Sequence, residues 1–140
     1  MLTMHDIYDK IQRDLDGSLE ELCRDIVEFL VSDQAKPLKH ITYITLVNGS
    51  RLRFEDTETQ IQLLKVTDYL SSHRLHLLDM HFQFVENDSS EPVPVDDEEI
   101  SHALHTGEFY HPKSGQLIQD YNRFLFPFFT PTEALERLHD

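Results

Sequence analysis

The chain has 140 residues, and its 26 Asp and Glu against 12 Lys and Arg give a formal net charge of −14. The length predicts one domain, residues 1–140, with its own hydrophobic core. So much negative charge repels phosphate and disfavours direct binding to nucleic acid, whereas it suits a basic protein partner, mimicry of DNA, or simple solubility.

The cysteine content and the apolar runs indicate the compartment. Cys23 is the only cysteine, so no internal disulfide can form, which fits a reducing environment. The first ten residues carry acids where a signal peptide is basic. No apolar run approaches the roughly 18 residues of a membrane helix. We therefore expect a cytoplasmic protein without membrane association.

The N-terminal segment, residues 4–32, has the apolar spacing of helix. Apolar side chains recur there at steps of three and four residues, with charged residues between them. Thr3 with Asp6 can cap the start, and Gly17 followed by Ser18 marks a second start. Two helices, about 4–15 and 19–32, are expected, with one kinked helix as the alternative.

Residues 40–55 predict the centre of the fold. Asn48-Gly49 between two apolar, β-branched runs is the strongest short-range signal for a β-hairpin, because a type I′ turn needs positive φ at both positions. Such a hairpin places Ile41, Tyr43 and Val47 on one face, which must be covered. The expected fold is therefore α+β, an antiparallel sheet built around this hairpin with helices packed on one face.

The middle of the chain contains three further segments. Residues 57–72 fit a helix or a two-sided strand, and the capping pattern from Thr57 to Gln60 favours helix. Residues 75–86 alternate in polarity and predict a strand. Residues 87–96 contain two prolines and predict an acidic loop.

The C-terminal third predicts four further elements. A helix is expected over 97–106, capped by Asp96 and ended by Gly107. A hairpin should follow, with strands at 108–111 and 116–119 around a Pro-Lys-Ser-Gly turn. The aromatic run 121–129 predicts a strand that lies at a sheet edge or breaks at Pro127, because Pro127 cannot donate to a ladder. The expected last helix covers 131–139 and is capped by Thr130.

The predicted helix 97–106 carries the best candidate metal ligands. Glu98, His102 and His105 lie four and three residues apart and share one face, and His111 lies just beyond. Imidazole and carboxylate groups at this spacing bind zinc or iron. A metal-dependent enzyme or metal sensor is therefore one hypothesis, and a solvated helix face is the alternative.

Two other segments are candidates for partner binding. The stretch from Glu86 to Glu99 has seven acids and no base. Within it, Glu91, Asp96 and Asp97 are expected to face a basic partner. In the aromatic run, Leu125 and Phe129 lie opposite the predicted core face and are expected to be exposed, where they could also support a homodimer.

The leading functional hypothesis is a small non-enzymatic protein-binding module of the regulator, inhibitor, immunity-protein or chaperone type, acting on a basic partner. The chain has no nucleophile elbow, phosphate-binding glycine loop or dinucleotide fingerprint. An enzyme is therefore not favoured, and no cofactor is expected apart from the divalent metal of the second hypothesis. A DNA-mimic protein is the third hypothesis.

Overall fold

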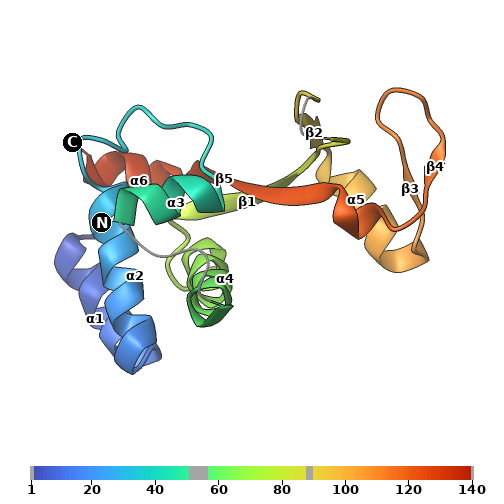
Figure 1. Cartoon of the computed structure of the whole chain (residues 1–140). Helices are drawn as coiled ribbons and strands as arrows, with labels where there is room; N and C mark the ends of the chain where they lie inside the picture. The colour runs from blue at the N-terminus through green and yellow to red at the C-terminus, as the bar shows by residue number, and fades with distance from the viewer. Residues whose placement is uncertain (1, 51–56, 88–89, 140) are drawn as a thin grey trace. The chain divides into compact units, whose positions relative to one another are not determined.

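The computed structural model describes residues 2–50, 57–87 and 90–139 (Figure 1). It confirms the α+β class, with six described helices and a three-stranded antiparallel sheet in the order β2-β1-β5. The chain forms two compact units: unit 1 comprises Met1–Asp79 and Phe129–Asp140, and unit 2 comprises Met80–Phe128. The expectation of a single domain stays a prediction.

Two helices open unit 1, as predicted. Helix α1, Met4–Asp14, begins with a reciprocal capping box between Thr3 and Asp6, with N···O distances of 3.0 and 3.1 Å. Helix α2, Gly17–Leu30, starts two residues earlier than expected, and Gly17 has a φ of 55°. This positive φ suits glycine and turns the chain sharply between the helices, so one kinked helix is excluded.

The predicted hairpin over 40–55 is wrong in its first strand and turn. Residues Tyr43–Ser50 form helix α3, and residues 51–55 lie outside the described part of the chain. Thr42 and Thr45 cap the start of α3 reciprocally, each backbone N–H donating to the other hydroxyl at 3.3 Å. Neither Asn48 nor Gly49 has the positive φ that a type I′ turn requires.

Gly49 has a packing role instead. A Cβ atom at this position would lie 2.3 Å from Cε1 of Phe29, so the missing side chain lets α3 approach α2 closely. Among residues 40–50, Ile41 forms an isolated antiparallel bridge with Phe129, and the backbone N–H groups of the two residues donate to each other's carbonyls at 2.8 and 2.7 Å.

The favoured helix over 57–72 is confirmed as α4, Thr57–Ser71. Helix α2 packs against α1, α3 and α4 and forms the middle of the unit 1 core. Its buried face includes Cys23, Ile26 and Val27, all fully inaccessible to solvent. None of the described helices is long and apolar enough to cross a membrane.

The prediction of an acidic loop over residues 87–96 is wrong in part, because a strand lies within it. Strand β1, Leu78–Phe84, was expected, but β2, Val93–Val95, falls inside the segment 87–96 and pairs antiparallel with β1. The apolar residues at both ends of β2 make this pairing favourable. Strand β5, Leu125–Pro131, lies at the sheet edge, as Pro127 predicted.

The elements on either side of β5 differ in their boundaries from the prediction. The aromatic run opens with a 3₁₀ turn, η1, Tyr121–Arg123, rather than with a strand. Helix α6, Glu133–Leu138, is capped by Thr132 and not by Thr130. The Thr132 hydroxyl accepts from the backbone N–H of Leu135 at 3.3 Å and donates to the carbonyl of His76 at 2.8 Å, so this cap also joins α6 to the start of β1.

Unit 2 confirms the predicted helix and hairpin. Helix α5, Asp97–Thr106, ends at Gly107, whose φ is 77°. Strands β3, Phe109–Tyr110, and β4, Leu117–Ile118, pair antiparallel across the turn. The core of unit 2 consists of buried residues from these elements and from the sheet: Phe84, Val95, Ala103 and Phe109.

Candidate functional site

A cleft of about 270 Å³ lies in unit 2 between α5 and β3. We call it the acidic cleft. Its lining combines three carboxylates with two histidines, aromatic rings and a proline: Glu98, Glu99, His102, Glu108, Phe109, Tyr110, His111 and Pro112. None of these described lining residues is a Lys or Arg, so the cleft offers an acidic, partly apolar surface.

The helical spacing of α5 explains one wall of the cleft. Glu98 and His102 are one turn apart, and Glu99 lies beside them, so all three project from the same side of the helix. Ala103 is buried instead against the core around Phe109. The helix is thereby held with its acidic side exposed to solvent.

The opposite wall is fixed by a hydrogen bond on β3. The Tyr110 hydroxyl donates to Oε2 of Glu108 at 2.7 Å, and this bond raises the pKa of Tyr110 above its ordinary value. The ring of His102 stacks near the Tyr110 ring, with the centroids 6.5 Å apart. The three side chains therefore present a carboxylate next to two flat rings.

His111 also lines the cleft, and both of its ring nitrogens have hydrogen-bond partners. Its Nδ1 accepts hydrogen bonds from the backbone N–H groups of Lys113 and Ser114 at 3.1 and 3.2 Å. Nδ1 therefore has no proton, and Nε2 donates toward Glu86 Oε2 at 3.4 Å. The side chain is only 14% exposed and rests edge-on against Phe84.

The structure brings together three of the four predicted metal ligands, because Glu98, His102 and His111 line the acidic cleft. His105 is not among the lining residues, and its Nδ1 lies 2.8 Å from the carbonyl of Ser101. Both ring nitrogens of His111 already have partners. Within the described residues no group of three His, Cys, Asp or Glu side chains is arranged to hold a metal ion, so the metal hypothesis gains no support.

The predicted acidic contacts lie on the same unit. Asp96 is the N-cap residue of α5 and Asp97 is its first residue, and both are exposed at the helix end where negative charge is stabilising. Glu91 lines a second hollow of about 210 Å³, together with Glu86 and Lys113. His111 and Pro112 line both hollows, so the two are neighbours on the surface.

The expected exposure of the aromatic run is corrected. Phe129 is fully buried and packs edge-on against Tyr43, with ring centroids 5.7 Å apart. Leu125 is half-buried against the unit 2 core. Phe128 is also buried, so side chains on both faces of β5 are covered near this point. Phe126 lies on the strand face opposite Leu125 and Phe129, where the sequence predicts the core, and it is 46% exposed.

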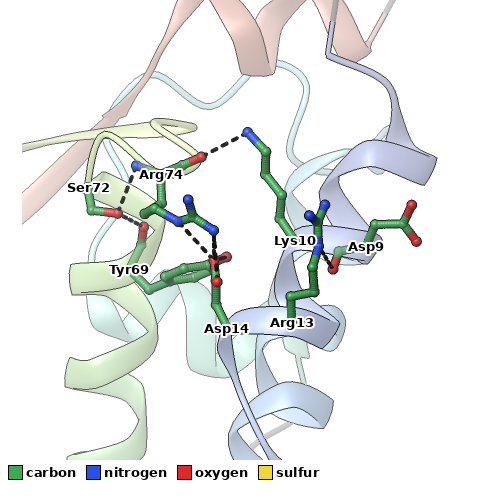
Figure 2. A network of polar contacts seen from close by, with 7 residues as sticks. All are labelled: Asp9, Lys10, Arg13, Asp14, Tyr69, Ser72 and Arg74. Carbon is green, nitrogen blue, oxygen red and sulfur yellow. Dashed lines mark hydrogen bonds and ion pairs between the residues drawn. The ribbon is translucent and has the colours of Figure 1, made fainter.

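Unit 1 contains a polar network that joins α1 to the end of α4 (Figure 2). The Asp14 carboxylate accepts from the Tyr69 hydroxyl at 2.6 Å and from Arg74 at 2.8 to 3.1 Å. Lys10 Nζ donates to the carbonyl of Arg74 at 3.2 Å. These groups are satisfied by one another, so the network is structural and is not a ligand site.

Comparisons of the chain with protein-family models, curated proteins and solved structures gave no match. The site therefore has to be interpreted from its own chemistry. Sequence reasoning identified Glu98, His102 and His111 but missed Glu108 and Tyr110. Their separation by two residues places them on one face of a strand, which is the signal that could have found them.

Proposed function

We propose that the chain is a non-enzymatic protein-binding module, of the regulator, inhibitor, immunity-protein or chaperone type, that binds a basic segment of a partner in the acidic cleft. The observation that carries the proposal is the lining of the cleft. It combines Glu98, Glu99 and Glu108 with aromatic surface and has no described cationic residue.

The charge of unit 2 supports this proposal. Its sequence has nine Asp and Glu against two Lys and Arg. A surface with one dominant sign attracts partners of the opposite sign and raises the rate of encounter, and salt screens this attraction over about 8–10 Å. The partner we propose is therefore basic, and its binding is salt-dependent.

The shape of the cleft supports a side-chain ligand rather than a flat contact. A Lys or Arg side chain has an apolar stem and a charged head. The ring of Tyr110, which is 46% exposed, suits the stem, and a planar guanidinium also stacks on an aromatic ring. We propose that the charged head is received by the carboxylate of Glu108, which accepts a hydrogen bond from the Tyr110 hydroxyl.

The test is capture of partners from the cells that make this protein, at low and at high salt. The cleft variant E98Q/E99Q/E108Q removes three charges from the acidic cleft. The control variant E21Q/D25N/E28Q removes three charges from exposed positions of α2. Circular dichroism establishes that both variants are folded.

We expect the wild type and the control variant to retain the same basic partner at low salt and to release it at high salt. The cleft variant should fail to retain this partner even at low salt. The proposal fails if the cleft variant retains the partner as well as the wild type does. It also fails if binding is indifferent to salt. The DNA-mimic hypothesis remains a prediction, and no observation on the cleft favours it.

A further inference from the structure

Helix α5 separates two hollows of different chemistry. Glu98, Glu99 and His102 line the acidic cleft, whereas Ile100, Ala103 and Leu104 line a hollow of about 130 Å³ on the other side. At about 100° per residue the centres of these two sets lie about 150° apart around the helix. The helix is therefore a ridge with an acidic hollow on one side and an apolar hollow on the other.

We call the second hollow the apolar groove. Its lining is largely hydrophobic and comes from α5, β1, η1 and β5: Phe82, Ile100, Ala103, Leu104, Tyr121, Asn122 and Leu125. Leu104 is 76% exposed although its neighbours Ile100 and Leu125 are half-buried against the core. A large apolar side chain so exposed beside an apolar hollow is typical of a contact surface.

We propose that a single basic segment of the partner crosses α5, with a cationic side chain in the acidic cleft and a large apolar side chain in the apolar groove against Leu104. This inference rests on the proposed function and specifies the partner further, because the segment must be amphipathic as well as basic. The cleft supplies the charge recognition, and the groove adds apolar burial.

The width of the ridge sets the spacing of the two anchor residues. An α-helix with its side chains is about 10–12 Å across. An extended chain rises about 3.3 Å per residue and its successive side chains point to opposite faces. Two anchors that both face α5 are therefore separated by an even number of residues, and about four residues span the helix. A cationic residue followed four positions later by Leu, Ile, Phe or Met is the expected pattern.

Charge complementarity selects the occupant. The chain itself carries a net charge of −14, so a second copy would bring additional carboxylates toward the acidic cleft. Like charges placed opposite each other at an interface are unfavourable. A basic amphipathic partner has no such penalty, and we therefore commit to it over self-association.

The test uses three synthetic peptides with a Trp at the amino end, since the chain has no Trp and peptide fluorescence reports binding directly. The first peptide has three arginines followed by Gly-Ser-Leu. The second ends in Ser instead of Leu, and the third has glutamines instead of the arginines. Each is titrated into the wild type, into L104A, into the cleft variant E98Q/E99Q/E108Q, and into L64A. Leu64 is an exposed leucine of α4 and provides the matched control.

We expect the wild type and L64A to bind the first peptide about tenfold more tightly than the second, as burial of one large apolar side chain commonly provides. In L104A this preference falls to about twofold or less, while the dependence on arginine is unchanged. In the cleft variant the first and third peptides bind alike.

Two different results would overturn the inference. If the wild type binds the first two peptides equally but still requires the arginines, the contact in the apolar groove is refuted and the proposed function stands. If binding does not depend on the arginines, both the groove contact and the proposed function are refuted. A dimer at micromolar concentration that L104A dissociates would show that a second copy occupies the groove.

Discussion

Replacement of Gly49 by alanine tests the packing of α3 on α2. The new Cβ would lie 2.3 Å from Cε1 of Phe29 and 2.5 Å from Cδ1 and Cζ. Carbon atoms in contact are normally about 3.5–4.0 Å apart, so the ring or the helix must move by more than about 1 Å. Phe29 is only 9% exposed, and its surroundings oppose such a shift.

The expected magnitude follows from two opposing effects. Overpacking of a well-filled core typically costs about 1–3 kcal/mol. The change from Gly to Ala inside a helix returns about 0.5–1 kcal/mol. We therefore expect G49A to lower the free energy of unfolding by about 1–2 kcal/mol, measured by urea denaturation with far-ultraviolet circular dichroism.

The neighbouring variant N48A is the control. Asn48 is exposed on α3, so alanine should leave the free energy of unfolding unchanged or raise it by a few tenths of a kcal/mol. In a type I′ hairpin both positions would need positive φ, and both variants would be destabilised. In an F29L background, where the ring is absent, the penalty of G49A should nearly vanish. A destabilised N48A, or a full G49A penalty in F29L, would refute the helical packing.

Three further predictions concern single side chains. Burial raises the pKa of the Cys23 thiol to about 12. A thiol reagent at pH 8 should therefore modify Cys23 only at the rate at which the protein unfolds locally or globally. Rapid labelling of the native protein would contradict this. The pKa of Asp14 is lowered by the hydrogen bond from Tyr69 and, to a smaller extent, by those from Arg74. These bonds therefore stabilise the folded protein fully above about pH 3.9, the pKa of Asp14 in the unfolded chain. Their contribution is lost as the pH falls through the lower pKa of Asp14 in the folded protein. The stability difference between wild type and D14N should therefore shrink below about pH 4, and urea titrations in which it grows would oppose the assignment. E108Q should lower the pKa of Tyr110 toward its ordinary value, seen by ultraviolet titration against a Y110F reference, and an unchanged curve would exclude the hydrogen bond.

The sequence predicts the ends of elements best where a short-range signal decides them. The capping pair Thr3 and Asp6 and the stop at Gly107 depend on residues within one turn of each other, and the structure has both. The turn after His111 likewise follows from Pro112 early and Gly115 late. These signals need no knowledge of the remaining chain.

The hairpin prediction failed because a local signal competed with a tertiary contact. Asn48-Gly49 favours a turn in isolation, but Gly49 is needed where α3 meets Phe29, and this proximity is not visible in the sequence. The reciprocal cap of Thr42 and Thr45 was the local sign of a helix. It is weaker than an Asn-Gly pair and was overlooked.

The candidate site was only partly predictable for a related reason. Helical spacing alone placed Glu98 and His102 together. The other wall of the acidic cleft depends on how β3 packs beside α5, and the apolar groove depends on Leu125 and Leu104 lining the same hollow of unit 2. Contacts between elements distant in the chain leave no periodic pattern within either element.

Nuclear magnetic resonance of the ¹⁵N-labelled protein, titrated with the arginine peptide that ends in Leu, locates the binding surface directly. We expect the backbone signals that shift to come from α5, from β3 and from the His111–Pro112 end of the acidic cleft, and to return toward their free positions as salt is added. Shifts centred on the exposed acids of α2, Glu21, Asp25 and Glu28, would contradict the proposed cleft and leave general charge attraction as the explanation. No shift at any peptide concentration up to the millimolar range would contradict a basic partner altogether.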